Sequence, residues 1–83
     1  MNALKTRWCW RKDLSEFRGL TDRERAGFLV FLEWFENFRL RYELPACREA
    51  AKVFWKSEVI REGREREKWQ LAQWADAIQW YLN

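Results

Sequence analysis

The sequence contains no histidine, and its 83 residues include only two cysteines, one proline and three glycines. Without histidine, and with Cys9 and Cys47 far apart and outside any CxxC pair, the usual zinc-binding spacings are excluded. The scarcity of cysteine also indicates a reduced intracellular chain, in which Cys47 is a small core residue. We therefore expect neither a bound metal nor a cofactor.

Long apolar runs are also missing. No apolar stretch approaches the roughly 18 residues that a membrane-spanning helix requires. The N-terminus carries "WCWRKD" (8–13), where a signal peptide would need a long apolar segment. We therefore expect a cytoplasmic protein with no membrane partner. No Ser or Cys lies beside a base and the carboxylates are scattered over polar faces, so we do not expect an enzyme.

Aromatic residues are what the chain has in excess. Seven Trp, six Phe and two Tyr make up 18% of the sequence, and each can bury roughly 150–250 Å². A chain of this length forms one domain, and its aromatic content suffices for a compact core without disulfides or metal. The net charge of +3 is mild. It permits a polyanionic partner without requiring one.

Helix signals dominate the sequence pattern. "TDRE" (21–24) is a capping box that predicts a helix running to about Tyr42. A short helix within "LSEFRG" (14–19), ended by Gly19, is expected before it. The apolar residues of the long helix recur at three and four positions and share one stripe. They are Phe28, Phe31, Leu32, Phe35, Phe38 and Tyr42.

Pro45 ends the long helix, because proline disfavours helical geometry at the residue before it. We expect a third helix over about residues 46–60, ended by Gly63, and a fourth from residue 64 or 65 to Leu82. The third helix's apolar stripe holds Cys47, Ala50, Ala51, Phe54 and Trp55. No alternating apolar pattern predicts a strand. The expected fold is all-α, a compact bundle of three main helices plus a short N-terminal helix, with residues 1–20 as an N-terminal segment and 21–83 as the helical domain.

The last helix has two different faces at about 100° per residue. Its core stripe holds Leu71, Trp74, Ala75, Ile78, Tyr81 and Leu82. The opposite arc holds Arg66, Trp69, Gln70, Gln73, Ala77 and Trp80. We expect the N-terminal segment, with Trp8, Trp10 and Phe17, to cover Trp80. Trp69 should stay exposed, and so should Arg66, Lys68, Gln70 and Gln73.

The arc opposite the core has the chemistry of a helix that reads a DNA groove. A glutamine amide can bond N6 and N7 of adenine, and arginine can bond O6 and N7 of guanine. Basic residues in the first turns lie near the positive end of the helix dipole, where phosphates are favoured. The candidate DNA contacts are Arg64, Arg66, Lys68, Trp69, Gln70 and Gln73. Alternatively, "REREK" (64–68) is a solvated helix start with local ion pairs, and the Trp-rich face docks a protein.

Three segments carry a family resemblance: "LTDRERAGFLVFLEWFENF" (20–38), "LPACREAAKVFW" (44–55) and "REKWQLAQWADAIQWYLN" (66–83). In this order they resemble the N-terminal core-binding, SAM-like domain of tyrosine recombinases, the family of phage and integron integrases. The family's first long helix has a hydroxyl cap, then a basic residue and an aromatic stripe. The matching positions are Thr21, Arg23, Phe28, Phe31 and Phe35, then Pro45 and 53–55, and in the last helix Lys68, Gln70, Ala75, Ile78 and Tyr81.

The resemblance implies a domain that clasps one side of recombination-site double-stranded DNA, with Arg23 as a further contact. A separate catalytic domain, carrying the family's nucleophilic Tyr, paired Arg and His, would clasp the other side. Other recombinase protomers would bind the same DNA. Since this chain has no histidine, we expect a fragment or standalone relic of an integrase that lacks the catalytic domain. The alternative is a small helical protein–protein interaction module.

Overall fold

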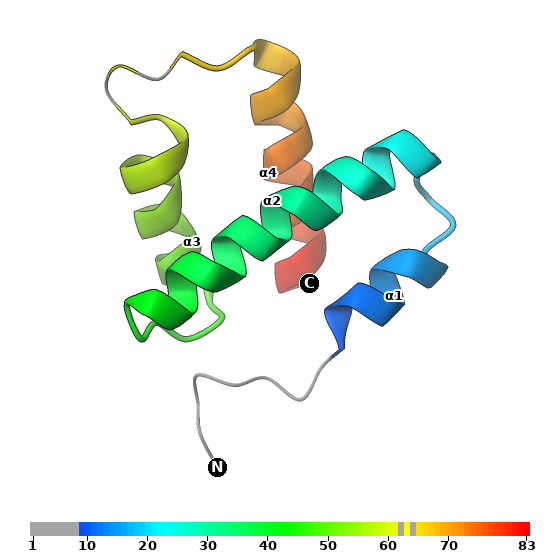
Figure 1. Cartoon of the computed structure of the whole chain (residues 1–83), viewed down its shortest axis with the longest axis horizontal. Coiled ribbons are helices and arrows are strands. Elements are labelled where there is room, and N and C mark those ends of the chain that lie inside the picture. Colours follow the sequence, from blue (N-terminus) through cyan, green and yellow to red (C-terminus); the bar gives the residue numbers. More distant parts are fainter. Residues whose placement is uncertain (1–8, 62, 64) are drawn as a thin grey trace.

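The computed structural model describes residues 9–61, 63 and 65–83. Within this part of the chain the structure is helical and contains no strand, which confirms the predicted all-α fold. The elements are α1 (Trp10–Glu16), α2 (Asp22–Arg41), α3 (Arg48–Phe54), the π-helical turn η1 (Trp55–Val59) and α4 (Lys68–Leu82) (Figure 1). Among the described helices, none combines the length and apolar character needed to cross a membrane.

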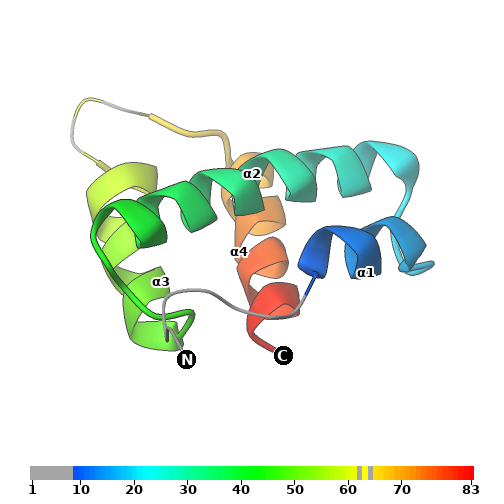
Figure 2. The same cartoon turned by 60° about the horizontal axis from the view of Figure 1, so that its bottom comes forward.

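Helix α2 organises the bundle. Its predicted capping box is present: Oγ1 of Thr21 accepts from the Glu24 amide at 3.1 Å, and Oε1 of Glu24 accepts from the Thr21 amide at 2.9 Å. The helix lies across α1, α3 and α4, which pack beneath it (Figure 2). Because α3 and α4 pack mainly against α2, the space between them is left as a groove.

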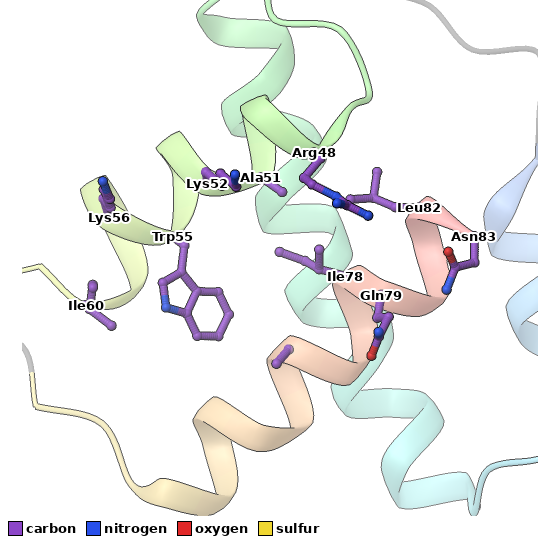
Figure 3. Close-up of a pocket in the computed structure, with 11 residues that line it drawn as sticks. Arg48, Ala51, Lys52, Trp55, Lys56, Ile60, Ile78, Gln79, Leu82 and Asn83 are labelled. Carbon is purple, nitrogen blue, oxygen red and sulfur yellow. The ribbon is translucent and has the colours of Figure 1, made fainter.

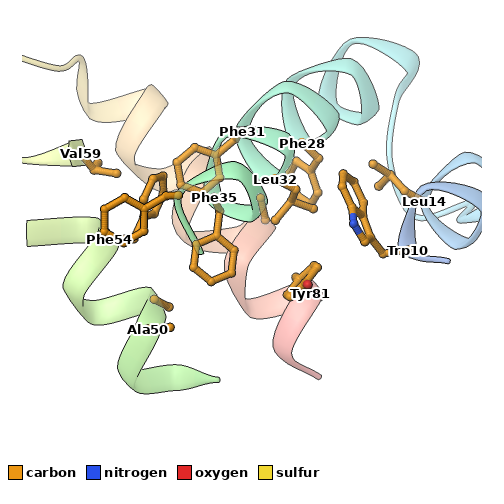
Figure 4. Packing of buried hydrophobic residues seen from close by; sticks show 13 residues of the cluster. Trp10, Leu14, Phe28, Phe31, Leu32, Phe35, Ala50, Phe54, Val59 and Tyr81 are labelled. Carbon is orange, nitrogen blue, oxygen red and sulfur yellow. The ribbon is translucent and has the colours of Figure 1, made fainter. Parts of the chain in front are cut away.

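The core is built largely from aromatic rings (Figure 4). Phe35 on α2 is fully buried and contacts Phe54 of α3 and Tyr81 of α4, at 5.2 and 5.7 Å between ring centroids. Phe31 stacks on Trp74 at 5.0 Å and 9° between planes. The central part of the predicted α2 stripe is therefore correct, since its rings pack against residues of α3 and α4.

The stripe is wrong at its end, because Tyr42 is 58% exposed. Helix α2 ends at Arg41, and Glu43 then adopts a positive φ of 55° that turns the chain. The Leu44 amide donates to the Arg39 carbonyl at 2.8 Å, and the buried Arg39 guanidinium donates to the Leu44 carbonyl at 3.2 Å. Because the chain turns back at Glu43, Tyr42 lies outside the core, with its ring against Phe38.

Helix α1 starts earlier than predicted, at Trp10 instead of within residues 14–19. The reason is tertiary: Trp10 and Leu14 lie one turn apart, and both are 1% exposed against the rest of the core. The Arg25 guanidinium binds the Leu14 and Leu20 carbonyls at 3.0 and 3.3 Å, which ties the α1–α2 connection to α2. Phe17 packs on Trp80 at 6.0 Å, so the expected covering of Trp80 is confirmed. Trp8 lies outside the described residues.

Helix α3 is shorter than the predicted 46–60. Cys47, its N-cap, has an extended backbone, and the helix changes to the π form at Trp55. This change buries Val59 completely, which the sequence pattern did not predict. The Cys47 side chain is partly buried against the core, as expected.

Helix α4 starts at Lys68, not at residue 64 or 65, and its core face is turned from the predicted one. Ala77, placed on the outer arc, is fully buried, whereas Ala75, placed in the core stripe, is exposed. One turn before Ala77, the Gln73 side chain lies against Gly27 of α2; one turn after it, Tyr81 packs on Trp10 at 6.1 Å. The face containing Ala77 is therefore buried because α2 and α1 cover it.

Candidate nucleic-acid interface

The residues predicted to contact DNA differ in how exposed they are in the structure. Lys68 and Trp69 in the first turn of α4 are exposed, as expected, with Trp69 63% exposed. Arg23 is exposed in the first turn of α2. Arg64 lies outside the described residues. The other three predicted contacts are engaged within the protein.

Arg66 is not on α4 and is only partly exposed, which corrects the prediction. Its Nε donates to the Val59 carbonyl at 3.2 Å and its Nη2 to the Glu58 carbonyl at 3.4 Å. The guanidinium also lies over the rings of Trp34 and Trp74, at 5.6 and 5.2 Å from their centroids. A cation favours both the carbonyl end of a helix and an aromatic face. Arg66 therefore joins the end of η1 to the start of α4.

The two glutamines are also partly buried, against the expectation that both are exposed. Oε1 of Gln70 accepts from the Glu67 amide at 3.0 Å and so caps α4. Gln73 fits against Gly27, where an added Cβ would come within 2.5 Å of its Oε1. Glycine thus leaves room for the Gln73 amide against the α2 backbone. The capping role of the Gln70 amide is one that its spacing on a helix does not reveal.

A groove with aromatic walls lies beside Trp69, and we call it the Trp69 groove. Its lining residues are Phe17, Leu20, Glu24, Phe28, Trp69, Ala72, Gln73, Asp76 and Trp80. The charged members, Glu24 and Asp76, are both acidic. Hydrogen bonds that the Glu24 carboxyl accepts, first from the Thr21 amide and then from the Thr21 side chain, lower its pKa below the ordinary value. Because anionic carboxylates repel phosphate, this groove is a poor surface for the DNA backbone.

A row of exposed cations lies instead on α3 and η1. Arg48, Lys52 and Lys56 recur at every fourth position, so they lie on one face of the helical segment and form what we call the cationic ridge. All three are exposed, and none forms an ion pair with another described residue. The ridge lines one wall of the groove between α3 and α4 (Figure 3).

The groove beside the ridge has a volume of about 530 Å³ and an apolar floor. The Trp55 ring projects into the space between α3 and α4, and Ile78 and Leu82 face it from α4 (Figure 3). Gln79 and Asn83 supply amides on the α4 side. None of the described residues that line this groove is acidic. An anionic partner would therefore meet cations, amides and apolar surface together in this groove.

Sequence reasoning missed the ridge, although the fourfold spacing of its cations is visible in the sequence. Such spacing is also typical of any solvated helix face, and only the position of α4 shows that these cations border a groove. No group of His, Cys, Asp and Glu in the described part of the chain could hold a metal ion. The chain gives no significant match to a family model, a curated protein or a solved structure.

Proposed function

We propose that this chain is the duplex-DNA-binding module of a site-specific recombinase and that the cationic ridge contacts the phosphate backbone. The observation that carries the proposal is the row of three exposed cations, Arg48, Lys52 and Lys56, without ion-pair partners among the described residues. Cations already paired with carboxylates would gain less from a phosphate. The ridge is free to neutralise phosphates and release their counterions.

The length of the ridge suits a DNA strand. Successive cations lie four residues apart, about 6 Å along a helix axis, so the ridge spans about 12 Å. A strand of duplex DNA presents one phosphate per roughly 3.4 Å of helix axis. Contacts with about three phosphates are therefore accessible to the ridge in a single orientation.

In this proposal the bases are read by the opposite wall of the groove, which α4 forms. The Gln79 amide can bond the N6 and N7 edge of adenine, the role that the sequence pattern suggested for Gln70 and Gln73. Gln79 is exposed and lines the groove. Arg23 and Lys68, also exposed, remain predicted phosphate contacts outside the ridge.

The recombinase part of the proposal rests on the resemblance of the three sequence segments to core-binding domains. In such a protein strand cleavage belongs to a separate catalytic domain, and the partners are that domain, recombination-site DNA and other protomers. The chain has no histidine, and the ring of Tyr81 is buried in the core. These features favour a binding module over an enzyme.

The proposal can be tested by fluorescence anisotropy with a short labelled DNA duplex, titrated at salt concentrations between about 50 and 200 mM. The three ridge contacts alone predict a slope of log K against log salt of about −3, and contacts by Arg23 and Lys68 would make it steeper. Lys52→Gln should reduce this slope by about one unit. Lys12→Gln, at an exposed position on α1 away from the ridge, is the matched control and should leave the slope unchanged.

Two results would overturn the proposal. One is DNA binding whose salt slope is the same in the parent chain and Lys52→Gln. The other is the absence of binding at protein concentrations of about 10⁻⁴ M and low salt, because nonspecific affinities of DNA-binding proteins lie around 10⁻⁴–10⁻⁶ M even at physiological salt.

A further inference from the structure

The Trp69 groove combines open aromatic surface with negative charge. It lies between the end of α1, the start of α2 and α4, and has a volume of about 470 Å³. Trp69 is 63% exposed and Phe17 is 41% exposed. Large aromatic side chains left in water beside a depression are typical of protein-docking surfaces, where such residues act as anchors.

The charge of this groove is opposite to that of the cationic ridge. Glu24 and Asp76 are exposed, line the groove, and form no ion pair with another described residue. No described basic residue lines it. A cation that enters the groove would therefore meet two carboxylates that have no ion-pair partner among the described residues, beside the exposed ring of Trp69.

We propose that the Trp69 groove docks a protein segment that presents arginine or lysine next to an aliphatic or aromatic side chain. The cation would lie between Glu24 and Asp76, and the apolar side chain would cover Trp69. The chain already uses this kind of recognition internally, since the Arg66 guanidinium lies 5.2 Å from the Trp74 ring and 5.6 Å from the Trp34 ring. Among the described residues, no cation lies over the Trp69 ring.

Nucleic acid fits this surface less well than a basic segment does. Phosphates would approach the carboxylates of Glu24 and Asp76, and like charges in close approach are unfavourable. The two surfaces use different residues, so this inference stands apart from DNA binding by the ridge. It assigns Trp69 to a protein partner, the alternative that the sequence pattern left open beside DNA contact.

The test uses an amidated peptide of alternating leucine and arginine pairs, and a counterpart with glutamate in place of arginine. Binding is followed in ¹H–¹⁵N NMR spectra through the indole signals of Trp69 and Trp80, assigned with Trp69→Phe and Trp80→Phe. The arginine peptide should shift both signals in a saturable manner. The glutamate peptide should leave the Trp69 signal in place, although the net charge of +3 favours an anionic ligand overall.

Charge removal in the groove provides the decisive comparison. The double variant Glu24→Gln with Asp76→Asn should weaken binding of the arginine peptide about tenfold, the sum of two partly exposed ion pairs. Glutamine can keep the capping box at position 24, and the amide signals report whether the fold is retained. Glu49→Gln, an exposed carboxylate on α3, is the control and should leave affinity unchanged.

Three results would overturn the inference: no shift of the Trp69 signal at millimolar peptide, equal response to both peptides, or unchanged affinity in the double variant. A shift of this signal by duplex DNA that Glu24→Gln and Asp76→Asn strengthen would assign the groove to nucleic acid instead. Lys52→Gln separates the two proposals, because it should weaken DNA binding and leave peptide binding unchanged.

Discussion

The indole Nε1 of Trp10 donates a 2.7 Å hydrogen bond to Oε2 of Glu36, which lies 26 residues further along the chain. The other carboxylate oxygen of Glu36 accepts from Nη2 of Arg11 at 3.1 Å. The Arg11 guanidinium also lies 4.4 Å from the Trp10 ring centroid. The Glu36 carboxylate on α2 therefore binds two neighbouring side chains of α1 and helps to orient that helix against α2.

Trp10→Phe keeps most of the buried ring but removes the indole donor. Since hydrogen bonds to charged groups contribute about 1.5–3 kcal/mol, we expect the free energy of unfolding to fall by about 2 kcal/mol. Urea unfolding followed by far-UV circular dichroism measures this change. Trp69→Phe, at an exposed tryptophan, should change it by less than about 0.5 kcal/mol. Equal effects of the two variants would show that the Trp10–Glu36 bond contributes no stability.

Arg66→Ala should destabilise the domain without altering the salt dependence of DNA binding. It removes two hydrogen bonds to the carbonyls of Glu58 and Val59 and the cation over two tryptophan rings. We expect a loss of about 2 kcal/mol in the free energy of unfolding. Arg61→Ala, at an exposed arginine of the same connection, should cost less than about 0.5 kcal/mol. Unchanged stability with a flatter salt slope would instead restore Arg66 as a DNA contact.

Substitutions of Gln70 distinguish a helix-capping role of its amide from a base-reading role. Gln70→Ala removes the acceptor of the Glu67 amide, and loss of a helix cap costs about 0.5–2 kcal/mol. Gln70→Glu keeps an acceptor in the capping box and should retain most of the stability. Thermal unfolding of both variants measures the difference. If Gln70→Ala kept full stability but lost preference for one base pair in DNA, the amide would serve recognition instead.

Ionisation of Tyr81 in the unfolded chain should lower the free energy of unfolding in alkaline solution. Burial raises the pKa of its phenol, and the Arg39 guanidinium opposes only part of that effect. The unfolded chain releases this proton near pH 10, while the folded state still holds it. The unfolded state then binds fewer protons, so the free energy of unfolding must decrease as pH rises above about 10. Unfolding in urea at several pH values between about 8 and 11 should show this decrease.

Tyr81→Phe should make the alkaline decrease less steep, because the phenol that is protonated in the folded core and ionised in the unfolded chain has been removed. Tyr42→Phe is the control, since Tyr42 is 58% exposed and ionises without first leaving the core. The attribution to Tyr81 would be wrong if both variants kept the slope of the parent chain.

Features that depend on neighbours in the chain could be predicted from the sequence. The capping box at Thr21 joins groups three residues apart, and the stripe from Phe28 to Phe38 follows from helix geometry alone. The all-α class follows from such local signals as well. Of the predicted site, the exposure of Lys68 and Trp69 was correct.

Other features depend on which segments meet in space. Nothing near Trp10 in the sequence indicates that Glu36 is its partner, although this contact helps to position α1 against α2. The cationic ridge was visible as a spacing, but its groove exists because α3 and α4 pack against α2 and leave the space between them open.

The sequence by itself determined the helices, their order and the charge of each segment, because these depend on local geometry and composition. Only the tertiary structure decided which polar side chains remain available to a partner. Arg66 and Gln70 carry groups suited to DNA, yet each is held by hydrogen bonds within the protein. A side chain has one position at a time, and the packing of distant segments fixes whether that position faces the protein or the solvent.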